Sequence, residues 1–211
     1  MDSGGKILRV LGGTYEPEQT GLFTRWVRPG NTVLDVGAHT GYYSLLAARL
    51  VGPSGTVWAF EPDPVNFSFL QRHVALNRVR EVHIEEAAVS DRQGTEPFER
   101  GSGTGTGHLG GNGKLRVNTT SVDEFCAAHD LRVSAMKIDV EGAEELVLRG
   151  AQTTLARDMP VLFLSTHGAD VHQKCVSLLQ SMGYVLRPIV GTQIATSVEL
   201  LAVSKEDGWP E

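Results

Sequence analysis

Short apolar runs alternate with amphipathic stretches along this chain. Val33, Leu34 and Val36 form a run with β-branched residues, which is typical of a buried parallel strand. Similar runs at residues 56–60, 82–89, 135–139 and 161–165 predict four further strands. Because helical patterns separate them, the order predicts an α/β fold with a doubly wound, mostly parallel sheet.

The helical patterns have recognisable ends. The expected helices are 16–27, 40–50, 64–77, 121–129, 143–155 and 170–183. Asp63 is expected to cap the third, which would bury Val65, Phe69, Leu70 and Val74. Ser121 with Glu124 resembles a capping box, and Asp170 is the expected cap of the last helix.

The ends of the chain complete a single domain over residues 1–211. Residues 1–30 are expected as an N-terminal extension, with a short strand at Ile7–Leu11 before the first helix. Residues 115–118 resume a strand-like pattern, while 184–189 and 199–203 predict an antiparallel pair at the sheet edge.

Residues 101–113 hold seven glycines, too many for a regular element. A flexible surface loop is the first expectation, and a mobile lid over a substrate is the alternative. A phosphate loop is excluded, because no strand leads into the stretch and no Gly-Lys-Ser/Thr ends it.

Composition and charge limit the classes of partner and the compartment that the sequence predicts. The net charge of −6, from 19 basic and 25 acidic residues, argues against nucleic acid or an anionic membrane as the main partner. Cys126 and Cys175 are expected to be reduced, partly buried thiols. The sequence shows no signal peptide or membrane-length apolar stretch, which predicts a cytoplasmic protein.

Polar groups gather where the predicted strands end. The tips carry Asp35 with Gly37, Glu61, Ala87 with Ala88, Asp139 with Glu141, and His167. Ligands of open α/β sheets bind at these carboxyl ends. Asp35-x-Gly37-x-x-x-Gly41 would bring backbone N–H groups and a helix N-terminus to a ligand, and Glu61 lies where a ribose diol would bind. Alternatively, Glu141 only caps the following helix and His167 is an ordinary loop histidine; Asp91 and Asp123 are expected as turn and cap residues.

Four motifs carry a family resemblance. In chain order they are Asp35-Val-Gly-Ala-His-Thr-Gly41, Phe60-Glu61-Pro62, Ala88-Val-Ser-Asp91 and Lys137-Ile-Asp-Val-Glu-Gly142. Over roughly Tyr15 to His167 the chain resembles the FkbM family of S-adenosylmethionine-dependent methyltransferases. The resemblance implies a Rossmann-like class I methyltransferase fold, with seven strands, the last antiparallel, and helices on both faces.

The resemblance also implies residue roles. Asp35, Gly37 and Gly41 would surround the methionine part of S-adenosylmethionine, and Glu61 would hold the ribose hydroxyls. Glu86, Ala87 and Ala88 would lie along the adenine, and Asp139 would lie between cofactor and acceptor. His39, Thr40, Tyr42 and Pro62 complete the expected cofactor site.

Three departures from the family bear on these roles. His39 stands where the glycine loop commonly has Asn. Ser165 replaces an acidic residue two positions before His167, so a Glu–His partnership is not assumed. The Gly-rich stretch matches no family motif and lies where acceptor specificity would be encoded.

Methyl transfer is an in-line displacement that depends mainly on positioning. A hydroxyl acceptor also gains from a base, for which His167 is suited and Asp139 is the alternative. Asp139, Glu141 and His167 could bind a divalent cation, but no metal is expected. The predicted function is O-methylation of a small-molecule hydroxyl, of a sugar or natural-product type, with homo-oligomerisation left open. Alternatives are an N- or C-methyltransferase, a nicotinamide-dependent oxidoreductase and a non-catalytic nucleoside-binding module.

Overall fold

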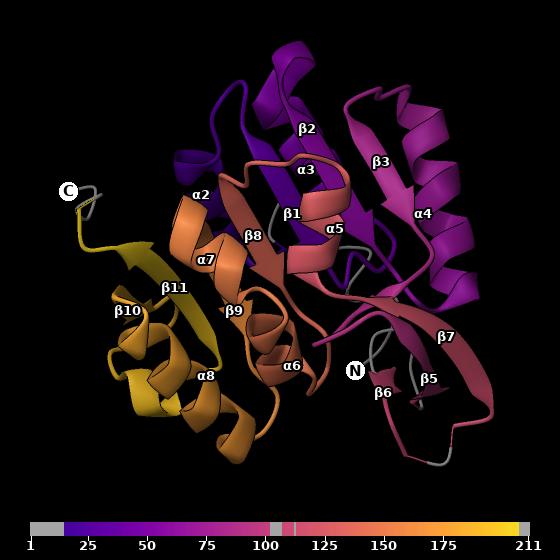
Figure 1. Cartoon of the computed structure of the whole chain (residues 1–211). Helices are drawn as coiled ribbons and strands as arrows, with labels where there is room; N and C mark the ends of the chain where they lie inside the picture. Colours follow the sequence, from indigo (N-terminus) through magenta and orange to yellow (C-terminus); the bar gives the residue numbers. More distant parts are fainter. Residues whose placement is uncertain (1–14, 102–106, 112, 207–211) are drawn as a thin grey trace.

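The computed structural model describes residues 15–101, 107–111 and 113–206, which form a seven-stranded sheet, a smaller four-stranded sheet and flanking helices (Figure 1). The strand order of the large sheet is β10-β11-β9-β8-β1-β2-β3. Its strands are β1 (Thr32–Val36), β2 (Thr56–Phe60), β3 (Val82–Glu85), β8 (Ala135–Ile138), β9 (Val161–Ser165), β10 (Tyr184–Pro188) and β11 (Glu199–Ser204).

The central strands are parallel and β11 is antiparallel to both of its neighbours. The predicted closing hairpin is confirmed, with β10 at the sheet edge and β11 between β10 and β9. The register of β1 and β8 sets Asp35 opposite Lys137. This pairing brings two charged residues together near the carboxyl ends of buried strands.

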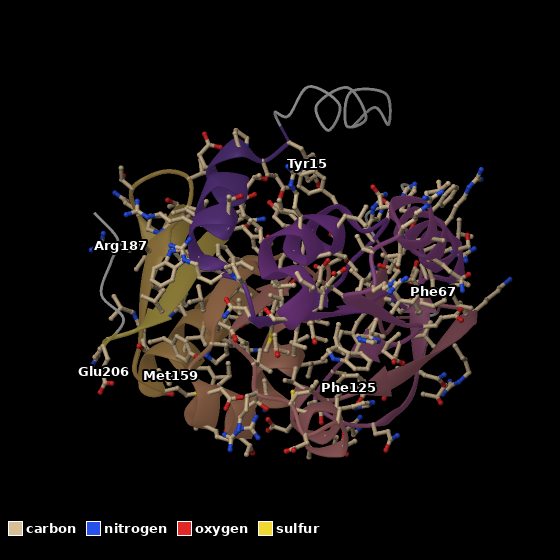
Figure 2. The ribbon with its side chains drawn as sticks, turned by 90° about the horizontal axis from the view of Figure 1, so that it is seen from above. Tyr15, Phe67, Phe125, Met159, Arg187 and Glu206 are labelled. Carbon is tan, nitrogen blue, oxygen red and sulfur yellow. The ribbon has the colours of Figure 1, made fainter. Side chains whose placement is uncertain are left out.

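Helices cover both faces of the large sheet. On one face lie α2 (Pro17–Trp26), α3 (Tyr42–Val51) and α4 (Pro64–Asn77), packed around Phe23, Ala47 and Leu70. On the other lie α5 (Val122–Ala128), α6 (Glu144–Arg149), α7 (Gln152–Asp158) and α8 (Ala169–Ser181). Figure 2 shows Tyr15 on the first side of the sheet and Phe125 with Met159 on the second. Short 3₁₀ turns are at Gly52–Ser54 and Ile194–Thr196.

The third predicted strand differs from the structure, because its second part belongs to the small sheet. The predicted strand over 82–89 is wrong in length, because β3 ends at Glu85 and β4 (Ala88–Val89) turns away to pair with β7 (Leu115–Thr120). β7 in turn pairs with β5 (Gly94–Glu99), which pairs with β6 (His108–Leu109). Ala88, Phe98 and Val117 form a separate small core there. Figure 1 places this sheet near the carboxyl ends of β2 and β3.

One predicted helix is two helices in the structure. The helix expected over 143–155 is divided into α6 and α7 at Gly150, where a Cβ would lie 2.2 Å from the carbonyl oxygen of Ser90. The Asp123 carboxylate then accepts hydrogen bonds from the backbone N–H groups of Thr153 and Thr154 at the start of α7. A side chain distant in sequence therefore caps the second helix.

The helix α4 has its predicted N-cap but a different buried face. Asp63 accepts hydrogen bonds from the N–H groups of Val65 and Asn66, as expected. Leu70 is buried, whereas Val65 and Phe69 are each 45% exposed, which contradicts their predicted burial. The cap of α8 is Gly168 and not Asp170, which lies inside the first turn.

Several expectations fall at or beyond the described residues. The proposed strand at Ile7–Leu11 lies outside them, as do residues 102–106 and 112 of the Gly-rich stretch. His108 and Leu109 from that stretch form β6. Cys126 and Cys175 are free and buried. In the described part of the chain, no helix combines the length and apolar character needed to cross a membrane.

Candidate functional site

The glycine turn after β1 is held tightly against the neighbouring strands. The N–H groups of Gly37 and Ala38 donate to the carbonyl oxygen of Phe60, at 3.1 and 2.9 Å. Gly37 has φ 84°, and a Cβ there would lie 1.9 Å from the carbonyl oxygen of Asp139. Only glycine fits this approach, so the tips of β1, β2 and β8 meet at one point.

Asp35 is buried beneath this turn. Its Oδ2 accepts a 2.6 Å hydrogen bond from the Ser44 hydroxyl of α3, while its Oδ1 has no hydrogen-bond partner among the described residues. Burial raises the pKa of Asp35 above its usual value. The nearby Lys137 ammonium lowers this pKa, but by less than burial raises it. A buried acceptor of this kind suits a cationic ligand group.

Lys137 lies on β8, opposite Asp35 of β1 in the register of the two strands. It is 3% exposed, and its Nζ lies 2.9 Å from Asp139 Oδ2 and 4.9 Å from the centre of the Tyr43 ring. Burial lowers the pKa of Lys137, but the Asp139 and Asp35 carboxylates outweigh this and raise it. The lysine is therefore a buried cation shared by two carboxylates.

Glu61 joins the glycine turn to the loop after β2. Its Oε2 accepts the His39 N–H at 2.8 Å and its Oε1 accepts the Asp63 N–H at 3.0 Å. Burial raises the pKa of Glu61 to about 7, although these N–H groups favour its charged form. His39 has φ 53°, a left-handed conformation that directs its N–H to this carboxylate.

The other expected cofactor residues flank this arrangement. Gly41 has φ 93° and caps α3, and the Thr40 carbonyl oxygen lies 2.7 Å from His73 Nδ1. The ring of Tyr42 packs edge-on against Tyr15, with centroids 4.8 Å apart. Pro62 lies between Glu61 and the Asp63 cap of α4.

The segment expected along the adenine divides in two. Glu86 and Ala87 line a cavity of about 320 Å³, together with Asn118, Thr119 and Phe125. Ala88 is buried in the core of the small sheet with Phe98 and Val117. Glu86 and Ala87 therefore line the cavity, and Ala88 does not.

The second group of polar side chains lies at the tips of β8 and β9. His167 Nε2 is 3.8 Å from Asp139 Oδ1 and 3.6 Å from Glu141 Oε2. Glu141 has φ 56°, a conformation that costs a non-glycine residue about 1–2 kcal/mol. Such strain near other functional groups suggests that the turn serves to place the carboxylate.

Glu144 completes the group and was not among the expected site residues. Its Oε1 lies 2.8 Å from His167 Nδ1, and its side chain is fully buried. The hydrogen bond to Glu144 raises the pKa of His167, as do the charges of Glu141 and Asp139, while burial opposes them. The Glu–His partnership therefore exists, with the acid supplied by α6 and not by the position of Ser165.

Asp139, Glu141 and His167 also form a possible metal-binding group. Each offers one ligand atom, and these atoms all lie within 4.8 Å of one another. Two carboxylates and an imidazole suit several divalent cations. The same three groups suit proton transfer, since Lys137 already neutralises part of their charge.

Two functional candidates were thus missed from the sequence. Lys137 belongs to one of the family motifs, but no function was predicted for it. The sequence feature that could have identified it is a charged residue inside an otherwise apolar strand. Glu144 follows that strand in the first turn of a helix, where acidic residues are common for electrostatic reasons alone.

Comparison with known proteins identifies similar sequences. A family model described as the methyltransferase FkbM domain matches residues 35–186, which include all the expected site residues. The 31-O-demethyl-FK506 methyltransferase FkbM of Streptomyces tacrolimicus is 44% identical over 68 residues, or 32% of this chain and 25% of that protein. Methyltransferase sdnD of Sordaria araneosa is 27% identical, covering 56% of this chain and 59% of that one. The chain thus matches only part of the length of these relatives.

The fold has counterparts among solved structures. The methyltransferase FkbM structure from Methylobacillus flagellatus KT superposes with a TM-score of 0.61 and 17% identity, covering 87% of this chain and 50% of that one. At this identity the match shows the fold alone. It confirms the expected doubly wound sheet of the class I methyltransferase type.

Proposed function

Because the chain belongs to the methyltransferase FkbM domain family, we propose that it transfers the methyl group of S-adenosylmethionine to a hydroxyl of a small molecule. Family membership confirms the resemblance of the motifs and implies this cofactor. The choice of a hydroxyl acceptor rests on one observation, the His167 imidazole held by Glu144 beside Asp139 at the tips of β8 and β9.

The cofactor is assigned to the tips of β1 and β2. Asp35 Oδ1 is a buried acceptor that suits the α-ammonium of the methionine part. Glu61 suits the ribose hydroxyls, which would share its oxygens with the N–H groups of His39 and Asp63. The cavity beside Glu86 and Ala87 suits the adenine.

The acceptor is assigned to the tips of β8 and β9. S-adenosylmethionine bound at the neighbouring tips would supply the methyl group, whose C–S bond would break as the C–O bond to the acceptor oxygen forms. The hydroxyl proton passes to His167 Nε2, and the products are a methyl ether and S-adenosylhomocysteine. Asp139 and Glu141 stabilise the imidazolium that results, and Lys137 fixes Asp139 through Oδ2.

The same basic group and two further facts support a small hydroxyl compound as the acceptor. A basic group facing the site suits an alcohol, whose proton must be removed, better than an amine that is already nucleophilic once neutral. The net charge of −6 is unfavourable for nucleic acid. The printed name of the relative from Streptomyces tacrolimicus also describes an O-methyltransferase.

The test is a mass-spectrometric screen of alcohols, sugars and amines with S-adenosylmethionine, followed by kinetics on the best acceptor. His167→Ala should lower kcat about 10²–10⁴-fold, because a positioned base contributes that much. The Kd of S-adenosylhomocysteine, from calorimetry, should stay unchanged. His83→Ala is the control, since that exposed ring lies on β3 and stacks on Trp58 of β2.

The proposal assigns the cluster to proton transfer without a metal. Turnover should therefore persist in EDTA. Loss of activity in EDTA with recovery in Mg²⁺ would make Asp139, Glu141 and His167 a metal site, and full activity of His167→Ala would remove the base.

A further inference from the structure

We propose that Glu144 is a positioning residue for His167: from the first turn of α6, its buried carboxylate holds Nδ1 so that Nε2 faces the acceptor. This inference rests on the proposed role of His167 as the base.

The contact joins the turn after β8, the first turn of α6 and the tip of β9. The turn after β8 runs through Glu141 and Gly142, both with positive φ, and delivers Glu144 to the first position of α6. Glu144 Oε1 then accepts the Gly142 N–H at 3.0 Å and lies 2.8 Å from His167 Nδ1. The backbone hydrogen bond limits the rotation of the carboxylate, and the carboxylate in turn fixes the imidazole ring.

Glu144 is a poor candidate for a purely structural role. Its side chain is completely buried, and Oε2 has no hydrogen-bond partner within the described ranges 15–101, 107–111 and 113–206. An unsatisfied buried carboxylate oxygen costs stability, and buried charge pairs can often be replaced by apolar groups without loss. The position is explained better by what it does to His167.

The chemistry of the contact determines which ring nitrogen is basic. A carboxylate oxygen accepts hydrogen bonds, so Nδ1 carries the proton in this contact. The lone pair of the neutral ring is then on Nε2, which faces Asp139 and Glu141. Neither carboxylate donates a proton to Nε2, so this nitrogen is the one that can take a proton from a hydroxyl.

The charged surroundings also favour the product of that step. His167 is faced by Asp139 and Glu141 from the turn after β8 and by Glu144 from α6. The Glu144 carboxylate also acts electrostatically on Cys175 of α8, whose pKa is raised to about 12, mainly by burial. Cys175 therefore stays a neutral thiol and adds no charge beside Glu144.

A direct test does not need the acceptor. Long-range ¹H–¹⁵N NMR of the full chain reports which nitrogen of His167 is protonated and at which pH the ring titrates. We expect the proton on Nδ1 in the wild type and a lower titration midpoint in Glu144→Gln, because the hydrogen bond to the carboxylate is the main cause that raises this pKa. Glu145→Gln is the matched control, since Glu145 pairs with Arg149 and Lys174.

Kinetics then separate positioning from structural support. Glu144→Gln should lower kcat at least about tenfold, a part of the full contribution of the base, with cofactor Kd unchanged. The acid limb of the pH–rate profile should move to lower pH with the NMR midpoint. In a His167→Ala background the same substitution should have no further effect on kcat, because the two residues act as one unit.

The outcomes distinguish the two proposals. A wild-type imidazole with its proton on Nε2, an unchanged midpoint in Glu144→Gln, or an equal loss of kcat in both backgrounds would overturn the role of Glu144. If His167→Ala is fully active while NMR of the wild type shows the proton on Nδ1, the role of His167 as the base is overturned. The contact between Glu144 and His167 would still stand.

Discussion

The two ends of the candidate site are built in different ways. At the tips of β1 and β2, Asp35 and Glu61 are buried, and Glu61 accepts hydrogen bonds from two backbone N–H groups of adjacent loops and from the side-chain amide of Asn66. At the tips of β8 and β9, Asp139, Glu141 and His167 are each about one-third exposed and interact through their side chains. The first end is a fixed cradle formed largely by the backbone, whereas the second is a cluster of charges from separate elements.

This difference matches the two proposed tasks. A cofactor common to a whole family can be held by a rigid, backbone-defined site. A base must exchange protons with an acceptor, so its groups need access to solvent and to one another. Lys137 connects the ends, because it pairs with Asp139 and lies opposite Asp35 in the register of β1 and β8.

Removing this connection should have the largest effect. Lys137→Met would leave the buried Asp35 and the partly buried Asp139 without their shared cation, which should lower the free energy of unfolding by about 3–5 kcal/mol. Urea denaturation measures this loss. Lys174→Met is the control, since that exposed lysine pairs with Asp170 and Glu145, away from the site. Equal stability of Lys137→Met and the wild type would show that the two ends are electrostatically independent.

A change in the cradle should be the next most severe. Gly37→Ala would place a methyl group against the carbonyl oxygen of Asp139, at a positive φ that alanine disfavours. The overpacking should cost about 1–3 kcal/mol beyond its control, measured by thermal or urea unfolding. The control is Gly191→Ala, which has φ 87° but no atom within 4 Å of its added Cβ. If both variants lose the same stability, the strand tips are not in contact as described.

The smallest effect is expected on binding alone. Glu61→Ala should weaken the binding of S-adenosylhomocysteine by about 1–3 kcal/mol, because the ribose hydroxyls assigned to Glu61 would lose their acceptor. Glu81→Ala is the control. Glu81 precedes β3, so it lies at the amino end of that strand, whereas Glu61 lies at the carboxyl end of the neighbouring parallel strand β2.

The pH dependence of this affinity sharpens the test. The pKa of Glu61 is raised to about 7, so below this pH the free protein must release a proton before the carboxylate can accept both hydroxyls. Calorimetry should therefore show affinity rising with pH through about 7 in the wild type and not in Glu61→Ala. An unchanged Kd across both comparisons would remove Glu61 from the ribose.

The sequence by itself determined the elements whose causes are local. The apolar runs of β1, β2, β8 and β9, the Asp63 and Ser121 caps and the turn at Gly37 all appear in the structure. Hydrophobic period, capping and glycine conformation act within a few residues, so the residues themselves carry the information. The carboxyl ends of parallel strands must share one edge, which is why the sequence could predict that Asp35, Glu61, Asp139 and His167 lie along the same edge of the sheet.

Only the tertiary structure decided the contacts between distant elements. Glu144 meets His167 across 23 positions, and Asp123 caps α7 from about 30 positions away. The diversion of β4 into a second sheet and the exposure of Val65 and Phe69 likewise depend on neighbours from other parts of the chain. A carboxylate in a helix's first turn has the same local pattern whether it faces water or an imidazole. Its role is settled by the packing that removes it from water and by the partner that this packing supplies.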